Sequence, residues 1–199
     1  YVPLIKPRFP SLGAAKKTDD LIAKIRTLFQ AEDRSGEFVR EYLCNNFIYA
    51  ANRIPEICDN LTAIDSAMKW GYNHQLGPFE MWDAVGLEES LGVMERLGKA
   101  VPEKIREMVQ KGCRSFYDKR GDGLYFYDFM AQDYVRIEEH PRVIFLPSLK
   151  ERNRTILHNE AASLIDIGEG VACLEFHTKM NALDDLVIKM IFEGCDKVE

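Results

Sequence analysis

The sequence shows few signs of a disulfide-bonded or metal-binding protein. Its five cysteines are odd in number, widely scattered and include no C-x-x-C pair. Such thiols are typical of buried residues in a reducing cytoplasm rather than of a disulfide or zinc framework. The histidines show no H-x-x-x-H or E-x-x-H spacing, so no metal site is predicted. These cysteines and histidines are Cys44, Cys58, Cys113, Cys173, Cys195, His74, His140, His158 and His177.

Positive charge and long apolar runs are also lacking. Lysine and arginine number 26 against 32 aspartates and glutamates, which gives a formal net charge of -6 and a pI near 5.4. This balance argues against nonspecific binding to nucleic acid or to anionic membranes. The apolar runs fall far short of the roughly 20 residues that cross a bilayer, and the start shows no secretory leader. We therefore expect a cytoplasmic protein that neither spans a membrane nor binds nucleic acid.

The sequence does contain enough apolar material for a globular core. Hydrophobic residues make up 46% of the 199 residues and aromatic residues 11%, which is typical of a folded chain. This length provides one good core, or one domain with a piece of another. The sequence begins YVPLIKPRFP without methionine and stops at EGCDKVE within a predicted helix. We therefore expect it to be a piece of a longer protein.

The first third of the sequence predicts a linker followed by two helices. Residues 1–17 hold three of the eight prolines and predict an extended linker. A helix is expected directly after Thr18, which is the predicted N-cap. Gly36 introduces a longer helical segment that Pro55 should interrupt. Five residues of that segment share one helix face: Phe38, Tyr42, Asn45, Ile48 and Tyr49.

The following helices are predicted from capping signals. Thr62 and Asp65 form a capping-box pattern that opens one helix. Pro78 fits the first position of a short helix, because its missing N–H would be unpaired there in any residue. Gly86 ends this helix, another follows directly, and Pro102 opens the last of the series.

After residue 112 the sequence pattern changes to that of strands. Residues 123–137 carry aromatic and β-branched side chains around a polar turn, which predicts a β-hairpin. Residues 138–160 hold two prolines and many charges, and are expected to form a connector. Two short strands around a Gly-rich turn are predicted over 162–176, and a helix over 181–198. The layout is a helical domain, a linker and the beginning of a β-rich or α/β domain.

Residues 70–87, WGYNHQLGPFEMWDAVGL, raise the sharpest functional question. Glu80 and Asp83 lie among two tryptophans and could be a general-acid pair, because burial raises the pKa of a carboxyl group. The alternative is a helix start whose aromatic side chains fill a core and whose acids stabilise the first turn. A spacing of three residues suits both interpretations, and we favour the helix start.

Three other stretches are candidates for chemistry. The glycines of DIGEGVA suggest a phosphate loop, but no helix follows directly, so a hairpin turn is favoured. Cys113 and His140 have no visible partner for nucleophilic catalysis, and core or surface roles are expected. In EFHTKMNALDDL, Lys179 precedes a helix start that could hold a phosphorylated ligand through backbone N–H groups. An ordinary N-cap at Asn181 explains this stretch equally well.

The segment YAANRIPEICDNLTAIDSAMKWGYNHQLGPFEMWDAVGL resembles the C-terminal helical domain of 3-hydroxyacyl-CoA dehydrogenases. The resemblance covers residues 36–130 and rests on an ID-x-A-M step, then GPFE with a later Asp and Gly. It implies a mainly α fold of the 6-phosphogluconate dehydrogenase C-terminal type. The residues that form this signature, with a structural role, are Asp65, Gly77, Pro78, Phe79, Glu80, Asp83 and Gly86.

The tail GVACLEFHTKMNAL resembles the first strand pair and CoA-contacting loop of the crotonase family of enoyl-CoA hydratases and isomerases. This resemblance implies an incomplete crotonase domain, a short β-hairpin and helix, over residues 161–199. Residues 1–35 would be an inter-repeat linker and helix, 36–130 the second dehydrogenase repeat, and 131–160 a linker. The residues implied to contact coenzyme A are Lys179, Met180, Asn181, Ala182 and Leu183.

Together the two resemblances imply the middle of a bacterial fatty-acid β-oxidation protein. The parent would pass hydride from a 3-hydroxyacyl-CoA to NAD, but the family's His–Glu pair and Gly-rich nucleotide fingerprint are absent here. Where the family's first repeat has a substrate-contacting Asn, this sequence has Arg40. We therefore expect no catalytic residue and neither NAD nor CoA bound to this piece alone. Its partners would be the other domains of the polypeptide and, in the parent, acyl-CoA; the alternative function is a homodimerisation or CoA-binding module.

Overall fold

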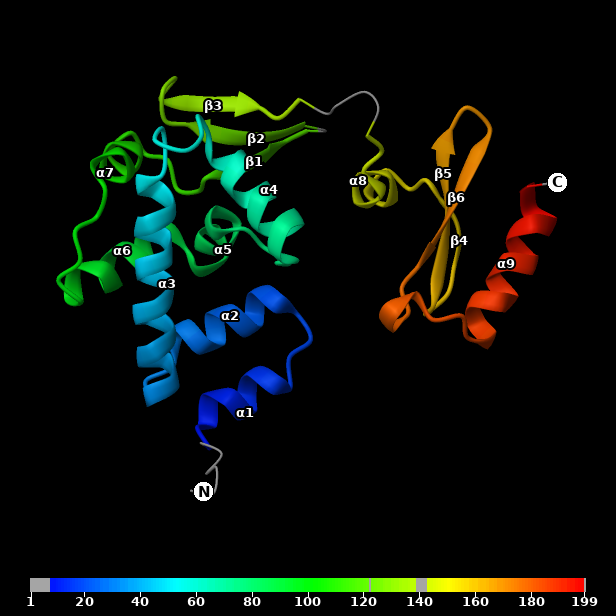
Figure 1. The fold of residues 1–199 in the computed structure, drawn as a ribbon, viewed down its shortest axis with the longest axis horizontal. Helices are drawn as coiled ribbons and strands as arrows, with labels where there is room; N and C mark the ends of the chain where they lie inside the picture. The colour runs from blue at the N-terminus through cyan, green and yellow to red at the C-terminus, as the bar shows by residue number, and fades with distance from the viewer. Residues whose placement is uncertain (1–7, 122, 139–142, 199) are drawn as a thin grey trace. The chain divides into compact units, whose positions relative to one another are not determined.

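The computed structural model describes residues 8–121, 123–138 and 143–198, which form two compact units (Figure 1). The first unit ends at Ile137 and the second begins at Glu138. Residues 1–7 of the expected opening linker, and His140, lie outside the described residues.

The first unit consists of helices followed by a small sheet, as the sequence predicts for its helical part. Strands β1, β2 and β3 form an antiparallel sheet in that order, so the predicted hairpin gains a third strand. The elements are α1 (Pro10–Lys16), α2 (Leu21–Gln30), α3 (Arg34–Asn52), α4 (Leu61–Tyr72), α5 (Pro78–Val85), α6 (Leu87–Arg96), α7 (Glu103–Gln110), β1 (Tyr117–Arg120), β2 (Gly123–Asp128) and β3 (Asp133–Arg136).

Helix α1 lies where the sequence predicted an extended linker. Pro10 occupies the first helical turn, where proline is well tolerated. Ser11 is buried, and its N–H and hydroxyl donate to the Asp33 carboxylate at 3.1 and 2.9 Å. Asp33 is also the N-cap of α3 and accepts from the N–H groups of Ser35 and Gly36. The hydrogen bonds that the Asp33 carboxylate makes to α1 and to α3 explain why α1 is ordered in this segment.

Several predicted helix starts were wrong by a few residues, including Gly36, which lies inside α3 instead of introducing it. The N-cap of α2 is Asp20, not Thr18, and the carboxylate accepts an N–H of the first turn at 2.8 Å. The N-cap of α4 is Asn60, whose side-chain oxygen accepts an N–H of the first turn at 3.0 Å. Thr62 and Asp65 therefore form no capping box, because both already lie inside α4. The helix boundaries at Pro55, Pro78 and Gly86 are confirmed.

Helix α3 has an aromatic face that points away from the core of its own unit. Phe38, Tyr42 and Tyr49 are 70%, 56% and 63% exposed, and they belong to the face that the sequence singled out. The buried face instead carries smaller residues with one phenylalanine: Leu43, Cys44, Phe47, Ala50 and Ala51. Of the predicted face, Ile48 packs against the core of the first unit, whereas the three aromatic side chains are exposed.

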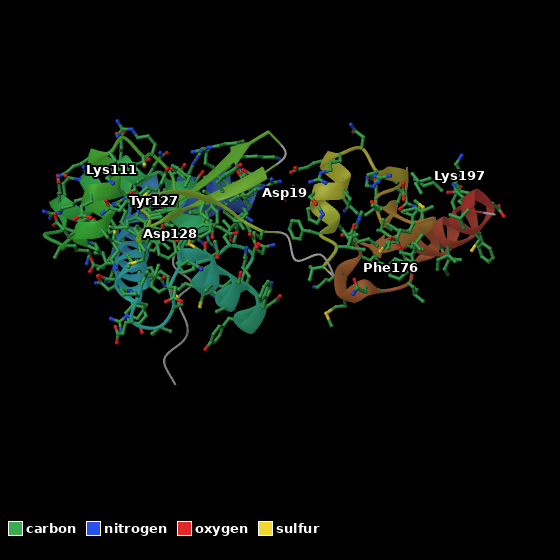
Figure 2. The ribbon with its side chains drawn as sticks, turned by 90° about the horizontal axis from the view of Figure 1, so that it is seen from above. Asp19, Lys111, Tyr127, Asp128, Phe176 and Lys197 are labelled. Atoms are coloured by element: carbon green, nitrogen blue, oxygen red, sulfur yellow. The ribbon has the colours of Figure 1, made fainter. Side chains whose placement is uncertain are left out.

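The core of the first unit is built around stacked aromatic rings from α3, α5 and the approach to β1. Phe47 stacks on Trp82 with ring centroids 4.9 Å apart, and Phe79 and Trp82 each lie 5.0 Å from Phe116. All four are fully buried, and the indole N–H of Trp82 donates to Ser90 Oγ at 2.5 Å. Nearby Tyr127, labelled in Figure 2, is 2% exposed. These rings bury a large apolar area with favourable ring geometry.

Basic side chains from other elements satisfy the carboxyl ends of three helices. Arg26 of α2 donates from Nε to Ala84 O at the end of α5, at 2.5 Å. Arg40 of α3 donates to two carbonyls at the end of α2, at 2.8 and 2.5 Å. Lys104 of α7 donates to two carbonyls at the end of α3. The last carbonyls of a helix lack partners within it and carry partial negative charge, so each cation stabilises a helix end.

The second unit is a three-stranded antiparallel sheet with helices. Strand order is β4-β5-β6, and β5 and β6 join through a turn in which Gly168, Glu169 and Gly170 all have positive φ. The predicted hairpin turn is thus confirmed, whereas the expected connector contains both a helix and a strand. Elements are α8 (Leu146–Glu151), β4 (Thr155–His158), β5 (Ala162–Gly168), β6 (Val171–Phe176), the 3-10 helix η1 (Lys179–Asn181) and α9 (Asp185–Val198).

Across the part of the chain that the structure describes, no helix is both long and apolar enough to cross a bilayer.

Candidate functional site

Asp65 is a buried acid that caps a helix other than its own. It lies in α4, is 1% exposed, and accepts the N–H groups of Phe79 and Glu80 at 2.9 and 3.0 Å. Both N–H groups belong to the first turn of α5. The phenol of Tyr117 donates to the same carboxylate at 2.9 Å. Asp65 therefore joins α4, the start of α5 and β1 at one point.

Glycine is required at position 77 because of this contact. A Cβ atom there would lie 2.3 Å from Cβ of Asp65, so any larger residue forces α4 and α5 apart. The Gly77 N–H donates to Glu80 Oε2 at 2.8 Å, and Glu80 Oε1 accepts from Lys69 Nζ at 2.5 Å. One carboxylate oxygen of Glu80 thus accepts from the start of α5, and the other accepts from a lysine of α4.

Asp83 performs a similar function for the chain that leads into β1. Its carboxylate accepts the N–H of Phe116 at 2.8 and 3.0 Å and that of Tyr117 at 2.9 Å. These backbone groups precede and begin the first strand, so Asp83 fixes the sheet against α5. We refer to Asp65, Glu80 and Asp83 as the acid cluster.

Burial has the largest effect on the pKa values of Asp65 and Asp83. It raises the pKa of Asp65 to about 6, against hydrogen bonds from Phe79, Tyr117 and Glu80 that lower it. Burial likewise raises the pKa of Asp83 to about 7, against the Phe116 and Tyr117 N–H groups, with the Asp65 and Glu80 charges adding to the rise. Burial and the Asp65 charge raise the pKa of the Tyr117 phenol well above its usual range.

The geometry supports the structural interpretation of residues 70–87. Every carboxylate of the acid cluster is occupied by backbone, phenol or ammonium donors, and α5 begins at Pro78 as predicted. The two tryptophans do not enclose the acids together, since Trp82 is fully buried whereas Trp70 is 84% exposed. A general-acid pair in an apolar pocket is not assembled here.

The predicted CoA-contacting loop forms η1 and its flanks. Met180 and Asn181 both have positive φ, at 63° and 52°, and Thr178 Oγ1 donates to Ala182 O at 2.7 Å. Met180 is 91% and Leu183 64% exposed. The N-cap interpretation of Asn181 was wrong, because α9 begins only at Asp185 and Asp184 accepts from the N–H of Val187. Contact of Lys179, Met180, Asn181, Ala182 and Leu183 with coenzyme A stays a prediction.

Within the part of the chain that the structure describes, the other sequence candidates are not brought together into a reactive site. The Cys113 thiol is partly buried in the first unit, next to the hydrophobic core. The Arg40 guanidinium is engaged by the end of α2. Among the described residues, no three His, Cys, Asp or Glu side chains are placed to hold a metal ion.

Comparison with known proteins finds a family match for the helical segment. Residues 39–127 match the family described as 3-hydroxyacyl-CoA dehydrogenase, C-terminal domain. This match contains the acid cluster and most of the aromatic core. It agrees with the resemblance carried by the ID-x-A-M and GPFE motifs.

Named relatives extend the similarity over nearly the whole chain. A Bacillus subtilis protein provisionally named 3-hydroxyacyl-CoA dehydrogenase is 41% identical over 194 residues, covering 98% of this chain and 24% of the relative. A Rickettsia felis protein provisionally named fatty acid oxidation complex trifunctional enzyme is 22% identical over 189 residues, 95% of this chain and 23% of the relative. The chain thus spans about a quarter of the length of these relatives.

Shorter relatives match only part of the chain. The 3-hydroxybutyryl-CoA dehydrogenase of Bradyrhizobium diazoefficiens is 29% identical over 116 residues, which is 51% of this chain and 40% of the relative.

Sequence reasoning missed two features of these sites. Tyr117 contacts Asp65 across 52 positions of the sequence, and no local pattern marks it. Ser163 meets both His158 and His177 in the second unit. The only available signal for that meeting was alternation in β5, which places Ser163 on one face of the strand.

Proposed function

We propose that this chain is the non-catalytic middle piece of a fatty-acid β-oxidation enzyme that oxidises 3-hydroxyacyl-CoA with NAD. The observation that carries this proposal is the match of residues 39–127 to the C-terminal dehydrogenase domain. The 41% identity along almost the whole chain to a relative about four times as long supports it further.

In this proposal the first unit supplies shape and apolar surface rather than acid–base groups. The carboxylates of its acid cluster accept hydrogen bonds from the starts of a helix and a strand. His74 is the sole histidine before residue 138. His74 is exposed, and its ring lies against Tyr72 rather than against a carboxylate. Hydride transfer to NAD and removal of the hydroxyl proton would therefore fall to groups elsewhere in the parent enzyme.

The second unit would begin a crotonase-like hydratase or isomerase domain. Support comes from the strand pair β5 and β6, which leads into a loop whose Met180 and Leu183 side chains are exposed. A loop with exposed side chains and two positive φ angles leaves backbone and apolar groups free to meet a ligand. In the parent enzyme we propose that coenzyme A lies there.

Kinetic comparison of the piece with its parent tests this function. NAD and 3-hydroxybutyryl-CoA added to this chain should yield no NADH, whereas the polypeptide expressed with its flanking coding sequence should yield NADH. Titration calorimetry of this chain with free CoA should show weak or no binding. NADH formation by the chain alone, or its absence from the extended polypeptide, would contradict the proposal.

A second candidate function is assembly through the aromatic face of α3. Phe38 and Tyr42 stack with ring centroids 6.2 Å apart, and Tyr49 carries the Arg53 guanidinium 4.9 Å above its ring. Two such helices, antiparallel about a twofold axis, would set Tyr42 against the partner's Tyr49 and Phe38 against the partner's Arg53. Stacking and cation–π contacts would then repeat on both sides of the axis.

Sedimentation equilibrium tests the assembly function. We expect a concentration-dependent homodimer whose dissociation constant rises more than about tenfold in the Phe38→Ser, Tyr42→Ser double variant, since buried aromatic anchors dominate such interfaces. Met130→Ser, which removes an exposed side chain from the loop between β2 and β3, is the matched control and should leave the dimer unchanged. A monomer at all concentrations would contradict this function.

A further inference from the structure

Helix α9 carries more apolar side chains than the sheet of the second unit covers. The residues of α9 that are buried lie on the face that packs on this sheet: Val187, Met190 and Gly194. A second apolar strip on the same helix is open to solvent. Ile188 and Phe192 are 44% and 68% exposed, and Cys195 is an exposed free thiol. We refer to Ile188, Phe192 and Cys195 as the α9 stripe.

The spacing of the α9 stripe is that of an interface between two helices. Its members follow one another at intervals of four and three residues, which is the repeat that keeps side chains on one line in a coiled coil. In a heptad they occupy positions d, a and d, and Lys189 and Asp196 both occupy position e. With 3.6 residues per turn, the stripe points about 130° away from the sheet-facing residues. A second helix can therefore reach it without displacing the sheet.

The charges beside the stripe favour a partner of a particular kind and direction. In an antiparallel pair of identical helices the e positions lie side by side, so Lys189 faces the partner's Asp196 and the twofold axis repeats the contact. In a parallel pair the e positions face position g instead, where α9 has the apolar residues Ile191 and Val198. The charges are therefore self-complementary in the antiparallel direction, which fits a second copy of the same helix.

The sizes of the side chains agree with this antiparallel register. The register that pairs Lys189 with the partner's Asp196 also sets Phe192 against the partner's Cys195 on both sides of the axis. A large side chain then meets a small one, which fills a helix interface without a void. Because α9 is already held on its own sheet, pairing does not require an isolated short helix to become ordered.

We propose that a second copy of this chain docks antiparallel on the α9 stripe, with Phe192 packed on the partner's Cys195 and Lys189 paired with the partner's Asp196. This inference stands on the second unit alone and does not depend on the proposed function. It is also separate from the assembly function of α3. The stripe has one aromatic side chain whereas α3 has three exposed ones, so the α9 contact should form at higher protein concentration than the α3 contact.

Carbodiimide cross-linking tests the α9 contact directly, because it joins an ammonium group and a neighbouring carboxylate as an amide. Unlabelled and nitrogen-15-labelled copies of the full chain are mixed before the reaction, and mass spectrometry identifies the linked peptides. Links between Lys189 and Asp196 should combine both isotopes. The ion pair of Lys189 with Glu193, at 3.6 Å within one helix, is the internal control and should give links of a single isotope. If no Lys189–Asp196 link combines both isotopes, the proposal is wrong.

Charge reversal tests whether the two ion pairs set the register. Sedimentation equilibrium is measured in a chain that also carries Phe38→Ser and Tyr42→Ser, which removes the α3 contact. Lys189→Asp or Asp196→Lys should each raise the dissociation constant on the order of tenfold, because like charges then meet twice across the axis. Both reversals together restore the pairs and should bring the constant back to within about threefold of its starting value.

The control for charge reversal is Lys197→Asp. Lys197 is exposed, is labelled in Figure 2, and occupies heptad position f, on the opposite side of α9 from the stripe. Its reversal should leave the dissociation constant unchanged. A double reversal that fails to restore association, or an equal loss in Lys197→Asp, would overturn the antiparallel arrangement.

Phe192→Ser tests the apolar part of the contact. Removal of this side chain should raise the dissociation constant more than about tenfold, since buried aromatic anchors dominate such interfaces. Phe192 is mostly exposed in one copy, so the second unit should stay folded. The Asn159 amide, which donates to Ala162 O at 3.0 Å, should keep its protection from hydrogen exchange. An unchanged dissociation constant would refute the docking of a second copy on the stripe.

Discussion

Replacing Asp83 with asparagine should remove a pH dependence from the stability of the first unit. Burial raises the pKa of this carboxyl from 3.8 to about 7, so the folded protein keeps the proton across a range in which the unfolded chain has lost it. The stabilisation is fully present below pH 3.8 and is lost as the pH rises through 7. Linkage at 1.36 kcal/mol per pKa unit puts the loss between pH 5 and pH 8 at roughly 2–3 kcal/mol.

Urea unfolding followed by tryptophan fluorescence measures this slope. Trp82 is fully buried in the first unit and should report its unfolding, whereas Trp70 is 84% exposed and should change little. The Asp83→Asn variant should unfold with a free energy that varies between pH 5 and pH 8 by roughly 2–3 kcal/mol less than in the wild type. Asp19→Asn, at an exposed position labelled in Figure 2, is the matched control and should keep the wild-type slope.

Comparing the pH dependence of the unfolding free energy in Asp83→Asn and in the wild type tests whether burial governs the protonation of Asp83. If Asp83→Asn and the wild type lose stability equally between pH 5 and pH 8, the burial of this carboxylate does not govern its protonation. The backbone N–H groups that it accepts would then hold it ionised in the folded state at pH 5 as well.

Three further substitutions test the packing of the first unit. Gly77→Ala should destabilise it by about 2 kcal/mol or more in urea unfolding, because the new Cβ overlaps the backbone of α4, whereas Gly71→Ala meets open space and should be neutral or stabilising. Arg40→Ala should lower the free energy of unfolding by about 1–2 kcal/mol by leaving the end of α2 uncapped, and no change would refute the cap. Phe116→Ala should cost about 3–5 kcal/mol and Phe38→Ala under about 1 kcal/mol in the monomer; similar costs would contradict the placement of the core.

Local sequence rules predicted many of the helix boundaries and turns correctly. Pro55, Pro78 and Gly86 mark boundaries because their backbone chemistry acts within one or two residues. The turn at Gly168 to Gly170 followed from the same kind of rule. Caps were less predictable, because Asp20 and Thr18 are both good N-cap residues and the choice depends on where the apolar face of α2 settles.

Long-range partners could not be predicted from the sequence. Periodicity shows that α3 has an aromatic face. Which face of α3 is buried depends on a tertiary partner, because Phe47 on the other face stacks on Trp82 of α5. Trp70 and Trp82 look alike in sequence, yet only the second lies on the inner side of its helix. Asp65 was given a local role and instead contacts residues 14, 15 and 52 positions away.

The basic side chains at the ends of α2, α3 and α5 limit which segments of the first unit can be gained or lost in evolution. Each of these helices is terminated by a cation that another helix carries, so none is complete when cut out by itself. A peptide of α2 alone should be only weakly helical, since short isolated helices are marginal in water. A deletion, exchange or duplication of a single helix should therefore leave helix ends without a cap and destabilise the fold. The whole first unit is the smallest segment that we expect to be gained or lost in evolution without this cost.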